Sequence, residues 1–147
     1  MKEFKLTKFD QIGIVVKDIE KVRKLFGYLF DFKVKINVVE QKATAIYKGE
    51  EVTFTMRKIM QNFDGKQLEV VELLESTGRH LYHEFIQAGK TGLHHLGVYV
   101  KEAKKIINHF KNEFDIDVIQ TGKAGRVKFY YLDTQEILGF YIELIAF

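Results

Sequence analysis

The sequence predicts an α+β fold in which two tandem βαβββ modules form one curled, cup-like mixed sheet with its helices outside. Two observations lead to this prediction: the chain contains an internal repeat, and each copy opens with the pattern of a strand followed by a helix. A length of 147 residues is ordinary for one compact domain. We therefore expect a single domain over residues 1–147, with module one at about 8–75, a linker helix at about 77–90 and module two at about 92–147.

The repeat aligns residues 9–34 with residues 93–118 without a gap, at an offset of 84. Eight of the aligned pairs are identical, among them Gly13 with Gly97. Seven of the other eighteen pairs exchange one apolar residue for another. Because chance similarity rarely keeps register over this length, we interpret the repeat as a duplicated module.

Copy one begins with an apolar stretch of strand length at residues 12–16. A helical pattern follows, in which apolar residues recur at spacings of three and four and so share one helix face. Asp18 directly precedes this pattern, where an acidic N-cap belongs. The residues of the apolar face are Ile19, Val22, Phe26 and Leu29.

Strand patterns complete copy one, separated by two turn signals. Lys48-Gly49 and Asp64-Gly65 mark the turns, and an Asp-Gly pair between strand patterns is a good hairpin signal. The predicted strands are residues 34–39, 43–47, 52–56 and 68–74.

Copy two repeats this order after a connecting helix predicted over residues 78–88. Its helix carries Ala103, Ile106, Ile107 and Phe110 on one face. The predicted strands of this copy are residues 96–100, 118–120, 127–132 and 140–146.

The composition excludes several classes of function. The chain has no cysteine, which excludes disulfides, thiolate metal sites and a cysteine nucleophile. Its net charge of +3 is small and its lysines alternate with acids, whereas a nucleic-acid surface needs a clustered basic stripe. No apolar run approaches the ~20 residues needed to cross a bilayer, and the charged N-terminal stretch lacks the core of a signal peptide. We expect a cytoplasmic protein without a nucleic-acid or membrane partner.

Polar residues that the two copies share inside apolar strands are the candidates for a site. Gln11 is paired with His95 by the repeat, and Glu72 matches Glu143 because each glutamate stands between two aliphatic residues. If those aliphatic neighbours face the helices, both carboxylates face the cavity of the curled sheet. Two carboxylates, an imidazole and an amide oxygen suit one divalent ion such as Mg²⁺, Mn²⁺, Co²⁺, Ni²⁺ or Zn²⁺.

Other polar and aromatic residues have blander interpretations. His80 and His83 lie three apart on the linker helix, so a two-residue metal site is conceivable there, but a solvated helix face is the favoured interpretation. Tyr130 or Tyr141 is a candidate for lining the cavity.

Four segments, spread along the chain between residues 9 and 147, resemble the vicinal-oxygen-chelate superfamily of glyoxalases, bleomycin resistance proteins and dioxygenases. They are FDQIGIVVKDIEK, VELLES, GLHHLGVYVKE and YIELIAF. The resemblance implies the same four metal ligands, namely Gln11, Glu72, His95 and Glu143. VELLES and GLHHLGV look most similar to the methylmalonyl-CoA epimerase branch, although that branch usually carries histidine where this chain has Gln11.

The departures from other branches narrow the expected activity. Glyoxalase I enzymes have an arginine and an asparagine that contact glutathione, where this chain has Val15 and Ser76. Extradiol dioxygenases need a 2-His-1-carboxylate iron site, and Gln11 removes one histidine from it.

The resemblance therefore implies an epimerase or isomerase that transfers a proton next to a carbonyl through a metal-stabilised enolate, with an acyl-CoA thioester as a candidate substrate. Glu143 is the expected base and Glu72 the second carboxylate. The alternatives are a glyoxalase I-like lyase and a non-catalytic small-molecule-binding protein of the bleomycin-resistance type. Family members are often homodimers, so the resemblance implies a homodimer here, and the sequence leaves open whether the cavity lies within one chain or across a dimer.

Overall fold

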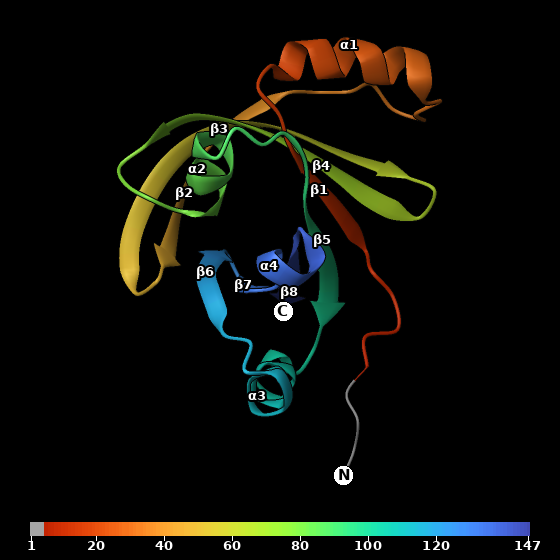
Figure 1. The fold of residues 1–147 in the computed structure, drawn as a ribbon. Coiled ribbons are helices and arrows are strands. Elements are labelled where there is room, and N and C mark those ends of the chain that lie inside the picture. Colours follow the sequence, from red (N-terminus) through yellow and green to blue (C-terminus); the bar gives the residue numbers. More distant parts are fainter. Residues whose placement is uncertain (1–4) are drawn as a thin grey trace.

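The computed structural model describes residues 5–147; residues 1–4, the start of the charged N-terminal stretch, lie outside the described residues. A unit of one strand, one helix and three strands occurs twice along the chain (Figure 1). The first unit contains β1 (Gln11–Val15), α1 (Ile19–Leu29), β2 (Val39–Tyr47), β3 (Glu50–Phe63) and β4 (Lys66–Ser76). The second contains β5 (Gly92–Val100), α3 (Ala103–Phe114), β6 (Val118–Ala124), β7 (Val127–Leu132) and β8 (Tyr141–Ala146). Helix α2 (Leu81–Gln87) joins the units, and α4 (Gln135–Leu138) lies between β7 and β8.

Local sequence signals explain where these elements begin and end. The Asp18 side chain accepts hydrogen bonds from the backbone N–H groups of Glu20 and Lys21, which caps the start of α1. The turn between β3 and β4 has positive φ at both central residues, 51° at Asp64 and 73° at Gly65, as a two-residue hairpin of this kind requires. Among residues 5–147, no helix is long and apolar enough to cross a membrane.

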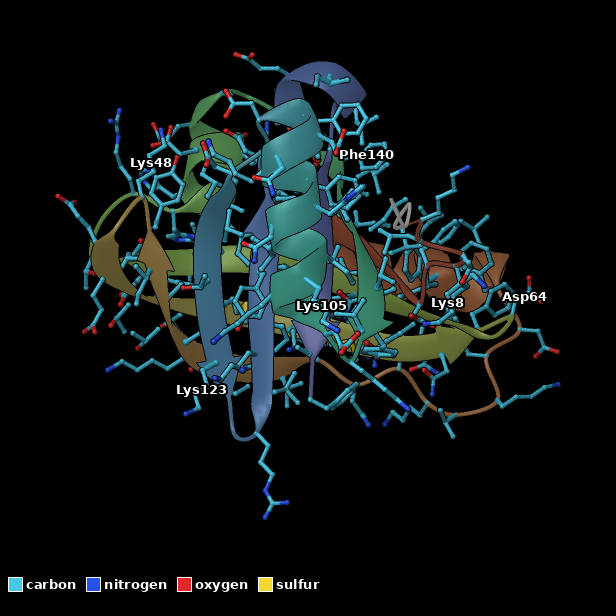
Figure 2. The ribbon with its side chains drawn as sticks, turned by 90° about the horizontal axis from the view of Figure 1, so that it is seen from below. Lys8, Lys48, Asp64, Lys105, Lys123 and Phe140 are labelled. Carbon is cyan, nitrogen blue, oxygen red and sulfur yellow. The ribbon has the colours of Figure 1, made fainter. Side chains whose placement is uncertain are left out.

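The eight strands form a closed barrel in the order β1-β4-β3-β2-β6-β7-β8-β5. Strand β1 pairs in parallel with β4, as its repeat equivalent β5 pairs in parallel with β8. The two units meet at two antiparallel seams, one between β1 and β5 and one between β2 and β6. Helices α1 and α3 lie outside the barrel on opposite sides (Figures 1 and 2). The α+β fold of two βαβββ modules is therefore confirmed, and the barrel closes within one chain.

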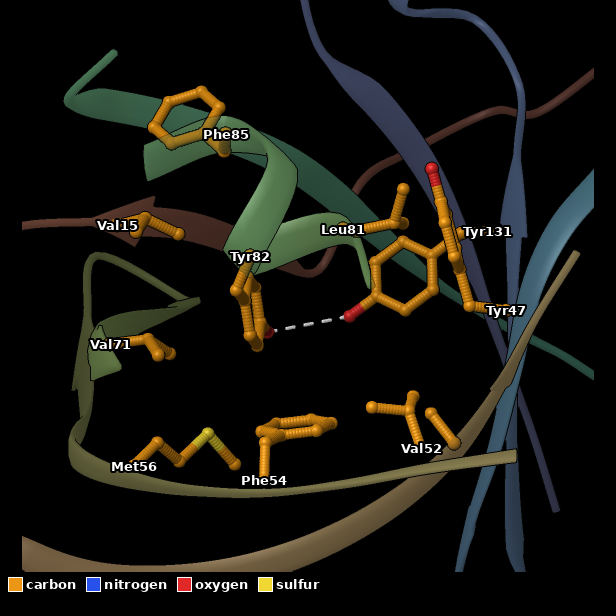
Figure 3. Close-up of a cluster of buried hydrophobic side chains, with 11 residues drawn as sticks. Val15, Tyr47, Val52, Phe54, Met56, Val71, Leu81, Tyr82, Phe85 and Tyr131 are labelled. Atoms are coloured by element: carbon orange, nitrogen blue, oxygen red, sulfur yellow. Dashed lines mark hydrogen bonds between the residues drawn. The ribbon is translucent and has the colours of Figure 1, made fainter. Parts of the chain in front are cut away.

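Two separate apolar clusters stabilise the barrel. Inside it, alternate residues of β3 and β4, such as Phe54 and Val71, pack against the buried face of α2, which carries Leu81, Tyr82 and Phe85 (Figure 3). Outside it, residues of the opposite parity on the same strands pack beneath α1; these are Ile59 and Val70, in contact with Ile19. One face of the β3–β4 hairpin therefore packs in the barrel interior, and the other face packs against α1.

One predicted element is wrong, and one short helix was missed. Residues 34–39 do not form a strand; only Val39 belongs to one, and Val34 is 68% exposed. The apolar residues Ile36 and Val38 pack against the cluster beneath α1, so they have a hydrophobic role without a strand partner. The short helix α4 was not predicted, because its four residues are too few to give a periodic pattern.

Candidate functional site

Four strands bring three oxygen acceptors to one imidazole inside the barrel. His95 on β5 is 0% exposed, and its Nε2 atom lies 3.0 Å from the Gln11 Oε1 atom on β1. The same nitrogen lies 3.2 Å from Glu69 Oε1 on β4 and 3.4 Å from Glu143 Oε1 on β8. The structure thus brings together three of the four predicted site residues, Gln11, His95 and Glu143, and adds Glu69.

The Gln11 amide is held with its oxygen toward His95. Its Nε2 atom donates a hydrogen bond of 2.8 Å to Gln67 Oε1, on the neighbouring strand. Gln67 Oε1 also accepts a hydrogen bond of 3.2 Å from the Tyr99 hydroxyl. Because the amide nitrogen is engaged by Gln67, the amide oxygen is the atom that this side chain offers to the site.

The two glycines that the repeat conserves create the room for this cluster. Gln11 stands opposite Gly97 across the β1–β5 seam, and Gly13 stands opposite His95. A Cβ atom on Gly13 would lie 2.0 Å from His95 Cε1, and a Cβ atom on Gly97 would lie 3.0 Å from Gln11 Cβ. The first copy therefore supplies Gln11 and, at Gly13, the space for His95. The second copy supplies His95 and, at Gly97, the space for Gln11.

Glu72 does not face the cavity, so this part of the prediction is wrong. Its Oε2 atom accepts a hydrogen bond of 3.0 Å from the backbone N–H of Ile19, at the start of α1. Its Oε1 atom lies 3.9 Å from Arg57, its cross-strand neighbour on β3. The aliphatic neighbours Val71 and Leu73 face the barrel interior instead of the helix, which turns Glu72 outward. Glu72 is a capping residue for α1.

Glu69 is the residue that the sequence analysis missed. The register of the parallel pairs makes it the equivalent of Glu143, because Glu69 is paired with Gly13 and Glu143 with Gly97. Two signals could have identified it. Leu68-Glu69-Val70 also places a glutamate between aliphatic residues, and Glu69 follows the turn glycine Gly65 by four residues, as Glu143 follows Gly139.

His94 contacts the His95 ring at Nδ1, the ring nitrogen that does not face the three oxygens. Its Nδ1 atom lies 2.9 Å from His95 Nδ1, and both rings are buried. Burial lowers the pKa of His94 well below its usual value, and the neighbouring His95 lowers it further, so the His94 ring is neutral. We assign the hydrogen bond as His95 Nδ1–H donating to His94 Nδ1, which leaves His95 Nε2 directed at the three oxygens.

The other predicted candidates fall outside the cluster. The expectation of a solvated face is wrong for His80, which is 0% exposed and stacks on Phe54 with 4.1 Å between ring centroids. Tyr130 lies on the opposite side of β7 from the cavity, and Tyr141 only packs against the inner core. Tyr131 is the tyrosine of β7 that lines the cavity, and its hydroxyl lies 3.5 Å from that of Tyr82 (Figure 3).

The two carboxylates have different proton affinities. Burial raises the pKa of Glu143 to about 7, with the nearby charge of Glu69 adding to the effect while His95 opposes it. Burial also raises the pKa of Glu69, but the hydrogen bond and charge of His95 and the charge of Lys58 outweigh it, so the pKa is lowered overall. Burial lowers the pKa of His95, yet the two carboxylates raise it overall. Such a divergent carboxylate pair is typical of acid–base sites.

The donor set fits a divalent cation on chemical grounds. The donor oxygens converge on His95 Nε2, and within residues 5–147 no group of three or more histidine, aspartate or glutamate side chains surrounds a common point. However, Glu143 Oε1 is buried without a hydrogen-bond partner, which is unfavourable unless a cation or donor meets it. One amide oxygen, two carboxylates and one imidazole are ligands that hard and borderline ions accept, and such an ion would replace the proton on Nε2.

A cavity of about 420 Å³ leads from these carboxylates to the surface. Its walls include Phe54 and Tyr131, and Glu69 and Glu143 lie on its lining. The β2–β6 seam is paired only from Ala45 to Tyr47, and the cavity opens where the remainder of β2 is unpaired on this side. Lysines line this opening; they are Lys42 and Lys123, with Lys128 on an adjoining hollow.

Comparison with solved structures gives the same fold. A hypothetical protein from Bacillus halodurans C-125 is similar over 95% of this chain and 94% of its own, with a TM-score of 0.65 and 19% identity. Methylmalonyl-CoA epimerase from Mycobacterium tuberculosis is similar over 95% and 87%, with a TM-score of 0.63 and 14% identity. The Streptomyces coelicolor enzyme in complex with 2-nitronate-propionyl-CoA is similar over 97% and 98%, with a TM-score of 0.57 and 19% identity. Identities this low show the shared fold alone.

No curated protein matches the sequence significantly. The family model described as the glyoxalase/bleomycin resistance protein/dioxygenase superfamily matches residues 10–131. This match includes β1, β5 and the first of the two carboxylates, so it covers most of the barrel and of the cluster around His95. The chain therefore belongs to the glyoxalase/bleomycin resistance protein/dioxygenase superfamily.

Proposed function

We propose that this protein is a divalent-metal-dependent epimerase or isomerase that moves a proton at a carbon next to a carbonyl. One observation carries the proposal: two buried carboxylates, Glu69 and Glu143, approach the same buried imidazole from strands that are equivalent in the repeat. Moving a proton from one face of a carbon to the other needs an acid and a base on opposite sides. Two carboxylates related by the pseudo-twofold axis supply such a pair.

Gln11, Glu69, His95 and Glu143 would hold the ion in this proposal, with Glu69 in the role that the sequence analysis gave to Glu72. When bound, the ion supplies Lewis-acid stabilisation of the negative charge that develops on the carbonyl oxygen. The low polarity of the barrel interior makes this stabilisation stronger than it would be in water.

Glu143 is the proton acceptor in the proposed reaction. Its Oε1 atom is buried without a hydrogen-bond partner, which leaves this oxygen available to the substrate. Glu69 would return the proton to the opposite face of the carbon. For this step Glu69 must start protonated; giving up its proton leaves a carboxylate that the nearby His95 and Lys58 stabilise, while Glu143 ends protonated.

An acyl-CoA thioester is the substrate class that we propose. The fold is shared with methylmalonyl-CoA epimerases, one of which is solved with methylmalonyl-CoA. A cavity of about 420 Å³ has the volume of a small-molecule site, and it accommodates an acyl end but not a whole coenzyme. The remainder of such a substrate would leave through the opening that Lys42 and Lys123 line, where their charges favour an anionic chain.

The decisive experiment combines metal binding with proton exchange. We would measure divalent-metal affinity by calorimetry, and then incubate the metal-loaded protein in D₂O with epimerisable acyl-CoA thioesters. The wild type is expected to bind one ion per chain and to introduce deuterium at the α-carbon. Glu143→Gln and Glu69→Gln should each abolish epimerisation, because inversion needs a proton-transfer group on each face of the carbon, and each variant should keep at most the exchange of the one epimer that its remaining carboxylate can reach.

Glu72→Gln is the matched control, since it neutralises a carboxylate on the same strand that faces α1. Epimerisation that survives in Glu69→Gln would contradict the assigned role of Glu69. Metal binding without exchange on any tested thioester would favour a non-catalytic small-molecule-binding protein of the bleomycin-resistance type. An absence of metal binding in the wild type would refute the metal-dependent proposal.

A further inference from the structure

Two imidazoles lie side by side at the start of α2, outside the cluster around His95. His80 directly precedes the helix, and His83 belongs to its first turn. Their ring centroids lie 6.3 Å apart, as expected for residues that are three positions apart and share one helix face. The segment HLYHE, which contains both, therefore presents two side chains of the kind that bind metals.

The ring nitrogens of this pair are buried without partners. His80 is fully buried, and neither its Nδ1 nor its Nε2 atom has a hydrogen-bond partner. The Nδ1 atom of His83 is also buried without one. A neutral imidazole carries one N–H donor and one acceptor nitrogen, so either tautomer of His80 leaves both unsatisfied. Because buried polar atoms nearly always have a partner, these nitrogens indicate that a group outside the polypeptide meets them.

Packing fixes the His80 ring without covering its nitrogens. Phe54 stacks on one face of the ring, with an angle of 15° between the two planes. Tyr82 packs against it edge to face, with 5.9 Å between centroids. The lone pair of an imidazole nitrogen lies in the ring plane, so stacking on a face leaves it accessible to a metal. The backbone N–H of Glu84 donates a hydrogen bond of 2.9 Å to the His80 carbonyl, which anchors the residue to the helix.

The chemistry of the pair favours a borderline transition-metal ion. Burial, together with the charge of His83, lowers the pKa of His80 to about 4, so the ring is neutral near pH 7 and keeps a lone pair. Imidazole suits Zn²⁺, Cu²⁺ and Ni²⁺, whereas Mg²⁺ and Ca²⁺ prefer oxygen ligands.

The spacing of the rings is compatible with one shared ion. A metal–nitrogen bond of about 2.0–2.1 Å places a ring centroid about 3.2 Å from the ion, so a separation of 6.3 Å is at the upper limit for two rings. His83 is only partly buried, and a small rotation of its side chain brings the two nitrogens closer to the ion.

We propose that His80 and His83 form a second metal site, for a borderline divalent ion such as Zn²⁺. Within residues 5–147, no group of three histidine, aspartate or glutamate side chains is arranged around a common ion, so water would fill the remaining positions. The neighbouring Glu84 is held by Arg79 at 3.0 Å and is not counted as a ligand. The site shares no residue with the barrel cluster, so this inference does not depend on the proposed function.

A bound ion would stabilise the position of α2. This helix packs its buried face into the barrel interior, and His80 connects its start to Phe54 on β3. An ion that binds the folded arrangement and not the unfolded chain stabilises the fold in proportion to its occupancy. With two protein ligands the ion exchanges with the solution, so the stability of the protein would depend on the concentration of the metal.

Zn²⁺ is the probe for this site. We would count the bound ions by calorimetry and follow the ring resonances of isotope-labelled histidines by NMR, in the wild type, His80→Phe and His83→Gln. His80→Phe keeps a ring stacked on Phe54, and His83→Gln changes a partly buried residue. His109→Gln is the matched control, because it removes a partly buried histidine from α3.

Zn²⁺ is expected to shift the ring resonances of His80 and His83 together in the wild type. Each of the two variants should weaken this binding event at least about tenfold, since even an outer-shell partner of a metal is worth about 10–100-fold in affinity. His109→Gln should leave the event unchanged. If His80→Phe fails to fold, His83→Gln decides alone.

His95→Gln separates this site from the barrel cluster. Zn²⁺ binding at α2 that persists in His95→Gln and is lost in His83→Gln would support the inference, even if the barrel cluster takes no ion. Binding that is lost only in His95→Gln would overturn it. Ring resonances of His80 and His83 that do not respond to saturating Zn²⁺ would also overturn it, and would show that buried water satisfies these nitrogens.

Discussion

Gly13 lies against the face of the His95 ring, so closely that a Cβ atom on Gly13 would be 2.0 Å from His95 Cε1 and 2.2 Å from Nε2. The two residues are cross-strand neighbours on β1 and β5. This contact explains why the repeat keeps glycine at this position, because any side chain there would displace the imidazole. The φ angle of Gly13 does not lie in the left-handed region, so its requirement is for space.

Gly13→Ala is therefore expected to push His95 out of the cluster. We expect the metal affinity to fall at least about tenfold, and the overpacked seam to lose about 1–3 kcal/mol of stability. Calorimetry and urea denaturation measure the two effects. Gly27→Ala in α1 is the control, because nothing lies within 4 Å of its added Cβ atom. That variant should retain metal binding and gain up to about 1 kcal/mol.

Glu69→Gln and Glu72→Gln should have opposite signatures, although they lie on the same strand. Glu69→Gln is expected to weaken metal binding strongly, since it removes a charged ligand. Glu72→Gln should leave the metal affinity within about twofold and lower the stability by about 1 kcal/mol, because it weakens the hydrogen bond to Ile19 at the start of α1. A metal-binding defect confined to Glu72→Gln would show that the strand faces are reversed.

His94→Leu tests the support behind the cluster. Removing the acceptor for His95 Nδ1–H leaves the imidazole free to rotate, and the metal affinity is expected to fall about 10–100-fold. Tyr141→Phe is a control, since its ring lies 5.3 Å from His94 and the change removes only a hydroxyl. Equal metal affinity in His94→Leu and the wild type would exclude a supporting role for His94.

The buried side chain of His80 should make the folded, metal-free protein less stable at acid pH. Burial, together with the charge of His83, lowers the pKa of His80 from 6.5 to about 4. Between pH 6.5 and about pH 4, the unfolded chain therefore binds a proton at His80, whereas the folded chain does not. The stabilising effect is complete above about pH 6.5 and is lost as the pH falls toward 4.

His80→Phe should remove this loss while keeping the ring stacked on Phe54. The difference in unfolding free energy between the variant and the wild type is expected to grow by about 1–3 kcal/mol from pH 7 to pH 4. Urea denaturation across this pH range measures it. A constant difference would mean that His80 titrates alike in the folded and unfolded states.

Much of the fold follows from the repeat, whereas the strand faces do not. Gln11 and His95 could be located from the sequence because they occupy the same position in two aligned copies. Glu72 was placed on the wrong face because both faces of its strand are covered. Successive residues of a strand point to opposite sides, and a local pattern does not tell which side is inside when both sides are covered.

Strand β4 shows this difficulty most clearly. Val70 packs beneath α1 and Val71 packs inside the barrel, so both faces of the strand are apolar and the run has no visible alternation. The register with β1, which pairs Glu69 with Gly13, distinguishes the glutamate of the site from the glutamate that caps a helix. That register depends on contacts between residues more than fifty positions apart, which no local window contains.

The β1–β5 seam has a stereochemical consequence. In a dimer of two identical modules, the same residue would stand on both sides of the axis. In the fused chain the halves differ, with a neutral amide at Gln11 and an imidazole at His95. A flat ligand lying on this axis would therefore meet an amide on one side and an imidazole on the other, although the two halves of the barrel have the same strand order.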